Sequence, residues 1–179
     1  MIENKLIAQN ITNLTDARYF AAWGVDYISF NTQSGSEFEI SLEDIKEIAD
    51  WIEGPKVLIE SNSLEFDEIA DGYILDNIYS SLPISKESFF RTSLEEVQKS
   101  LPAGNYIIKL NSTEELETVR SLNEGVISNI NLYLDISDIK LTEKASLGHH
   151  GLVIQGGEEE KAGVKSFDEL DELYDILMD

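Results

Sequence analysis

The chain has 179 residues, of which 42% are hydrophobic and none is cysteine, and its formal net charge is −22. These values predict one globular domain over residues 1–179 and exclude disulfides and thiolate chemistry. The charge repels nucleic acid and anionic membranes, and no apolar run is long enough to span a bilayer. We therefore expect a cytoplasmic protein without nucleic-acid or membrane partners, whose charge either keeps helix faces soluble or attracts a basic protein.

Short apolar segments rich in Ile, Val, Leu and Tyr recur along the chain. Most lack a clean alternation of apolar and polar residues, which is typical of strands covered on both faces. The predicted strands are Leu6–Ile11, Asp26–Asn31, Lys56–Ser61, Gly72–Asn77, Ser88–Thr92, Asn105–Leu110, Asn131–Ile136 and Gly151–Gln155.

Helix-start signals stand between several of these strands, each with a capping side chain three residues ahead of a carboxylate. They are Asn13–Asp16, Ser41–Asp44, Ser93–Glu96, Ser112–Glu115 and Ser166–Glu169. Repeated strand–helix alternation predicts parallel strands with right-handed crossovers, and about eight such units favour a closed barrel. The predicted fold is therefore α/β, a compact TIM (β/α)8 barrel, with an open flavodoxin-like sheet as the alternative. Some helices are expected to be shortened or missing, because Ile78–Glu87 and Ser137–His150 are too short to hold full helices.

Polar residues stand at the carboxyl ends of the predicted strands, where functional side chains gather in parallel α/β folds. They are Gln9, Asn31, Glu60, Asp76, Arg91, Lys109, Asp135 and Gln155. Their mixture of carboxylates, cations and amides predicts a small-molecule pocket. Lys109 and Asp135 lie on neighbouring predicted strands, where the carboxylate either acts as a general acid or forms a structural ion pair with the lysine.

Two further features of the last part of the chain bear on ligands. Gly156-Gly157 is a weak sign of a phosphate cradle, and the acidic run Glu158–Glu160 beside it opposes a bound dianion. His149-His150 has no accompanying metal-ligand spacing, so we expect no metal site and no cofactor. Trp23 and Trp51 fall on predicted helix faces and are expected to pack rather than to stack on a ligand.

The first strand and its turn, Gln9-Asn10-Ile11-Thr12, resemble the Cys-Gly-Ile-Thr motif of phosphoribosylanthranilate isomerase, the Amadori-rearrangement enzyme of tryptophan biosynthesis. The segments Asn13–Ala17 and Trp23–Phe30 resemble the first helix and second strand of that family. The resemblance returns at Ile107–Lys109, at Leu132–Asp135, and at Val153–Glu158 with Gly163–Lys165. It implies a single (β/α)8 barrel.

Carried over residue by residue, the resemblance implies altered chemistry. Asp135 matches the family's general acid, an aspartate at the end of the sixth strand, but Gln9 replaces the general-base cysteine and cannot take a proton near neutral pH. Phe38 stands where an arginine contacts the anthranilate carboxylate, and Gln155-Gly156-Gly157 replaces the phosphate motif Ser-Ser-Gly. The family's Gly-Gly phosphate loop after the seventh strand has no clear counterpart.

Two functional hypotheses follow, and they leave open whether the chain is an enzyme. In the first, the barrel has lost or altered its isomerase activity and binds a ligand or partner, with a small phosphorylated metabolite and a basic protein as candidates. In the second, it is an active sugar-phosphate isomerase, an intramolecular oxidoreductase-type enzyme acting on N-(5'-phosphoribosyl)anthranilate with Glu60 or Asp76 as the base. The catalytic candidates are Asp135, Gln9 and Lys109, and the substrate-binding candidates are Asn31, Glu60, Asp76, Arg91, Gln155, Gly156 and Gly157.

Overall fold

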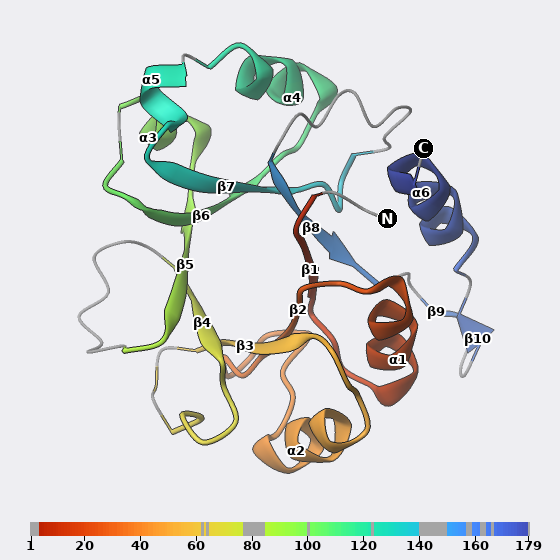
Figure 1. Cartoon of the computed structure of the whole chain (residues 1–179). Coiled ribbons are helices and arrows are strands. Elements are labelled where there is room, and N and C mark those ends of the chain that lie inside the picture. The colour runs from red at the N-terminus through yellow and green to blue at the C-terminus, as the bar shows by residue number, and fades with distance from the viewer. Residues whose placement is uncertain are drawn as a thin grey trace.

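Eight parallel strands close into a barrel in chain order in the computed structural model (Figure 1). The strands are β1 (Leu6–Gln9), β2 (Tyr27–Asn31), β3 (Lys56–Glu60), β4 (Gly72–Leu75), β5 (Glu87–Thr92), β6 (Gly104–Lys109), β7 (Ile130–Asp135) and β8 (Gly151–Gln155). The structure describes residues 4–61, 63, 65–76, 85–99, 101–122, 124–139, 150–156, 159–161, 164–165 and 167–178. Closure of the barrel between β1 and β8 confirms the predicted TIM-type fold over the open sheet.

The helices lie outside the barrel and follow the predicted pattern (Figure 1). They are α1 (Leu14–Trp23), α2 (Leu42–Asp50), α3 (Leu94–Gln98), α4 (Thr113–Arg120), α5 (Glu124–Ile127) and α6 (Asp168–Met178). A short antiparallel pair, β9 (Glu159–Lys161) and β10 (Val164–Lys165), precedes α6. No helix in the described part of the chain combines the length and the hydropathy needed to cross a membrane.

Side-chain caps begin four of the helices, as predicted. Asn13, Ser41, Ser93 and Ser112 each accept a hydrogen bond from the backbone N–H three residues further along. These bonds satisfy amides that a helix leaves unpaired in its first turn. The fifth predicted cap, Ser166, lies outside the described residues.

Several of the connections are short, which is how 179 residues form eight strands. Helix α3 has 5 residues and α5 has 4, and residues 65–69 between β3 and β4 form turns rather than a helix. The predicted loops at 78–87 and 137–150 lie mostly outside the described residues.

The barrel interior is filled by a layer of one side chain from each strand, separate from the larger core between barrel and helices. This lumen layer consists of Ile7, Tyr27, Leu58, Ile74, Phe89, Ile107, Tyr133 and Val153, none more than 4% exposed. Phe89 lies edge-on to Tyr27 and to Tyr133, with ring centroids 5.2 Å apart in both pairs. Gly151 on β8 leaves room for this packing, because a Cβ there would overlap the ring of Tyr133.

An aromatic cluster joins the first and last helices. Tyr19 stacks on Phe167 with centroids 4.1 Å apart and donates a hydrogen bond to Asp171, and Trp23 packs against Tyr174. The prediction for Trp51 was wrong: its side chain is 68% exposed, because it caps the carboxyl end of α2 instead of lying on the buried face of that helix.

Candidate functional site

The predicted polar side chains all lie at the carboxyl edge of the barrel, which we call the mouth. Gln9, Asn31, Glu60, Lys109, Asp135 and Gln155 end their strands, Arg91 is the penultimate residue of β5, and Asp76 directly follows β4. Gln9, Asn31, Glu60 and Asp135 are buried there, with 2–8% of their surface exposed. Gly156 directly follows β8, and Gly157 lies outside the described residues.

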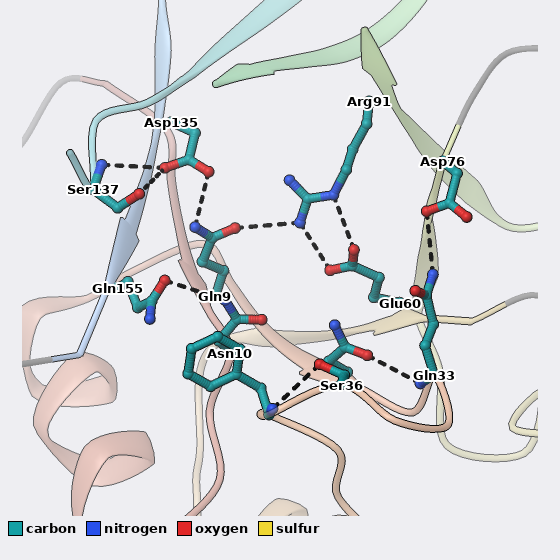
Figure 2. Close-up of polar contacts among 12 residues, drawn as sticks. Gln9, Asn10, Gln33, Ser36, Glu60, Asp76, Arg91, Asp135, Ser137 and Gln155 are labelled. Carbon is teal, nitrogen blue, oxygen red and sulfur yellow. Dashed lines mark hydrogen bonds and ion pairs between the residues drawn. The ribbon is translucent and has the colours of Figure 1, made fainter. Parts of the chain in front are cut away.

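A hydrogen-bonded chain crosses the mouth through Gln9 (Figure 2). The Nε2 of Gln9 donates to Oδ2 of Asp135 at 2.9 Å, and Nη2 of Arg91 donates to Oε1 of Gln9 at 3.3 Å. The single amide therefore joins β1 to β7 and to β5. The carboxamide donates from its nitrogen on one side and accepts at its oxygen on the other.

Arg91 continues the chain to β3 through a bidentate ion pair. Its Nε and Nη2 donate to the two carboxylate oxygens of Glu60 at 2.9 and 2.8 Å, and the two side chains are 28% and 8% exposed. Burial on its own lowers the pKa of Arg91, but the hydrogen bonds and charge of Glu60 outweigh it and leave that pKa raised. Arg91 is therefore a fixed cation already occupied by a carboxylate.

Asp135 is held from two sides. Besides the bond from Gln9, its Oδ1 accepts from the backbone N–H of Ser137 at 3.1 Å and from Ser137 Oγ at 2.7 Å. The predicted ion pair with Lys109 is not formed. Lys109 instead pairs with Asp138 at 2.8 Å, and this bond raises the pKa of Lys109.

The mouth also carries four side-chain amides, of which the sequence predicted Asn31 and Gln155 as site residues and missed Asn10 and Gln33. Asn10 adopts a left-handed backbone conformation, φ 57°, and its Nδ2 donates to Oε1 of Gln155 at 3.2 Å. Gln33 donates from Nε2 to Asp76 (Figure 2) and from its backbone N–H to Oδ1 of Asn31. Asn tolerates the left-handed region better than most residues, so an Asn after a strand end was the available signal for Asn10.

The strand order of the structure does not support the match between Asp135 and the general acid of the isomerase family. The resemblance equated Asp135 with an acid at the end of the sixth strand, but Asp135 ends the seventh strand, and the sixth ends with Lys109. The chain after β7 reads Asp135-Ile136-Ser137, without the Gly-Gly of a phosphate loop. By strand order, a lysine paired with Asp138 occupies the place of the acid.

The described mouth is therefore a ring of paired groups. Gln9, Arg91, Glu60 and Asp135 form one connected network, whereas Lys109 lies outside it, paired with Asp138. Within the described residues, no group of three or more His, Asp or Glu side chains is placed to hold a metal ion.

A closed parallel barrel with a polar mouth defines a TIM-type α/β barrel, and solved structures agree. The chain is similar to monomers generated from the dimeric phosphoribosylanthranilate isomerase of Thermotoga maritima, with 15% identity, a TM-score of 0.70 and 98% of each chain covered. It is also similar to TrpF from Jonesia denitrificans, with 12% identity and a TM-score of 0.68, over 98% of this chain and 97% of the other.

A third similar structure is a phosphoribosylanthranilate isomerase in complex with reduced 1-(o-carboxyphenylamino)-1-deoxyribulose 5-phosphate. It has 14% identity and a TM-score of 0.65, and 98% of each chain is covered. Searches against protein-family models and against curated proteins find no match. The structures therefore share the fold with this chain over its whole length, at identities that speak for the fold alone.

Proposed function

We propose that this chain is a phosphoribosylanthranilate isomerase-like barrel that no longer catalyses the Amadori rearrangement and uses its mouth to bind a ligand. The observation that carries the proposal is the position of Gln9, whose amide lies between Asp135 and Arg91. An Amadori rearrangement needs one group to donate a proton and another to remove one from carbon. Neither role is open to a carboxamide near neutral pH.

The remaining candidates for acid and base support the same conclusion. Glu60 holds Arg91 through both oxygens, and Asp135 accepts from Gln9 and Ser137. A base must reach a substrate proton directly or through one water, and Glu60 reaches its partner arginine instead. Loss of a positioned acid or base costs about 10²–10⁴-fold in rate, so loss of both removes the reaction.

The test is turnover of freshly generated phosphoribosylanthranilate, followed by the loss of its fluorescence. Wild type and Gln9→Cys are compared, with the Thermotoga maritima isomerase as the positive control for the assay. We expect no turnover from either form, because a cysteine alone restores the base but leaves Lys109 at the end of β6. Turnover by the wild type contradicts the proposal, whereas turnover by Gln9→Cys alone shows that the loss lies in the base.

One observation keeps an active isomerase as the second candidate. Asp76 is exposed at the mouth and is hydrogen-bonded to Gln33 without an ion pair among the described residues. Of the two carboxylates that the sequence offered as a replacement base, it is therefore the one that a substrate can reach. If the wild type turns over phosphoribosylanthranilate, Asp76→Asn should abolish the activity, and unchanged turnover in that variant would exclude Asp76.

A further inference from the structure

Two buried polar side chains of β2 have hydrogen-bonding capacity that the network does not use. Side chains alternate along a strand, and Tyr27 belongs to the lumen layer, so Ser29 and Asn31 also face the lumen. They are 1% and 8% exposed. In the described part of the chain, Asn31 uses its Oδ1 for Gln33, and neither its Nδ2 nor Ser29 Oγ forms a hydrogen bond, yet neither atom is fully enclosed, so water can reach both.

These groups lie beside the crossing network. Asn31 is the register partner of Glu60, and β1 with Gln9 is the other neighbour of β2. Buried polar groups in folded proteins are nearly always paired, with protein or with ordered water. The hydroxyl of Ser29 and the amide of Asn31 therefore mark a place where a ligand hydroxyl can replace a water and reproduce its hydrogen bonds.

The charges at the mouth determine which kind of ligand group can bind there. The described mouth holds the carboxylates of Glu60, Asp76, Asp135 and Asp138 against the cations of Arg91 and Lys109. Both cations are already paired, at 2.8 Å in each case. A phosphate or carboxylate would meet an excess of like charge at close range and would have to displace a bidentate carboxylate from Arg91.

We propose that the mouth binds an unphosphorylated polyhydroxylated molecule, a sugar or polyol. A hydroxyl group donates and accepts, so one hydroxyl can accept from Ser29 or Asn31 while others donate to Asp76 and accept from Gln33 at the rim. The inference rests on the proposed function, because it treats the mouth as a binding site. It goes further by naming a ligand class that differs from the phosphorylated ligand bound in the similar isomerase complex.

The experiment compares each sugar with its own phosphate ester. D-ribose against D-ribose 5-phosphate, and D-glucose against D-glucose 6-phosphate, are titrated into the full chain at low salt and followed by protein NMR shifts. At least one free sugar should bind, and its phosphate ester should bind at least about tenfold more weakly, because the ester adds a dianion beside Asp76 and Asp135, which accept hydrogen bonds but form no ion pair among the described residues. Tighter binding of the esters, or no binding of either sugar, overturns the proposal.

Two variants test whether the sugar binds at Ser29. Ser29→Ala removes the hydroxyl with little change of volume and should weaken binding of the free sugar about three- to tenfold, the effect of one hydrogen bond. Ser121→Ala, at the exposed carboxyl end of α4, is the matched control and should leave binding unchanged. Equal binding by Ser29→Ala and wild type overturns the assignment of the site.

A second variant covers the case in which Ser29→Ala fails to fold. Asp76 is exposed, and Asp76→Asn removes one charge from the rim, so the preference for free sugar over phosphate ester should shrink by at least about threefold. An unchanged preference contradicts the charge argument. The isomerase assay decides the proposed function separately: sugar binding without turnover sustains both proposals, absence of both turnover and sugar binding defeats only the sugar proposal, and turnover defeats the loss of activity.

Discussion

At the scale of single residues, the amide of Gln9 determines which hydrogen bonds connect the strands at the mouth. A thiol offers one weak donor, whereas the carboxamide of Gln9 donates to Asp135 and accepts from Arg91 at the same time. The amide links the two neighbouring charged groups, Asp135 and Arg91, through a single side chain. The gain is a fixed arrangement of β1, β3, β5 and β7 at one end of the barrel.

Removing one partner of the Arg91–Glu60 ion pair should lower the stability of the fold, mainly because the other partner is left as a buried charge without a counter-ion. Arg91→Met should destabilise the chain by about 3 kcal/mol, because it strands a buried carboxylate without a cation. The double variant Glu60→Gln/Arg91→Met should be less destabilised than Arg91→Met alone. Both are measured by denaturant unfolding at neutral pH.

A surface pair gives the matched control for this prediction. Arg120, paired with Glu117 on the exposed face of α4, has a side chain that is 43% exposed. Arg120→Met should cost no more than about 0.5 kcal/mol. A double variant as unstable as Arg91→Met alone would mean that packing of the arginine, rather than its charge, stabilises the mouth.

The sequence predicts the members of the site better than their partners. The predicted alternation of strands and helices correctly placed all eight polar residues at one edge of the barrel, because the end of each strand can be predicted from local composition. Lys109 and Asp135 are register neighbours, as predicted, yet Asp135 bonds to Gln9 of β1 and Lys109 to Asp138. Contacts across the lumen depend on barrel closure and on rotamers, which no local pattern encodes.

At the scale of elements, caps explain how very short helices persist. Helix α3 has 5 residues, fewer than an isolated helix needs, and the side chain of Ser93 and the carboxylate of Glu96 satisfy each other's backbone amides. The sequence predicted this cap and three others correctly, because the capping pattern is local.

The cap of α3 should have a measurable cost when removed. Ser93→Ala should destabilise the chain by about 1 kcal/mol, since the amide of Glu96 loses its acceptor in a helix with few other bonds. Thr118→Ala, on the exposed face of α4, is the control and should change stability by no more than about 0.5 kcal/mol. Equal small effects in both variants would show that α3 is held by packing of Val97 alone.

At the scale of the whole molecule, several tyrosines make the fold sensitive to high pH. Burial and hydrogen bonding to Asp171 raise the pKa of Tyr19 to about 12, and burial and nearby carboxylates raise that of Tyr133 to about 12. Burial, followed by bonds to Glu87 and Asp67, also raises the pKa values of Tyr27 and Tyr73. All four groups are neutral in the folded chain at pH 7.

A raised folded pKa means that stability is fully present below the unfolded pKa of 10 and falls as pH rises above it. Each such tyrosine should cost up to about 1.4 kcal/mol per pH unit between pH 10 and 12. Unfolding by denaturant at pH 8, 9, 10 and 11 measures this loss, with tyrosinate absorbance as the titration signal. Tyr133→Phe should lose less stability over the same range. An identical slope of unfolding free energy against pH would show that ionisation of Tyr133 does not contribute to the loss.

The lumen layer also bears on how the strand ends of this protein can be engineered. The eight side chains of this layer, among them the contacting rings of Tyr27, Phe89 and Tyr133, lie below the polar mouth and support it. Among the described residues, Gln9, Arg91, Glu60 and Asp135 bond to one another and not to this layer, so substitutions at the mouth should leave the layer's packing intact. The chain is therefore a small platform on which new groups can be grafted at eight strand ends.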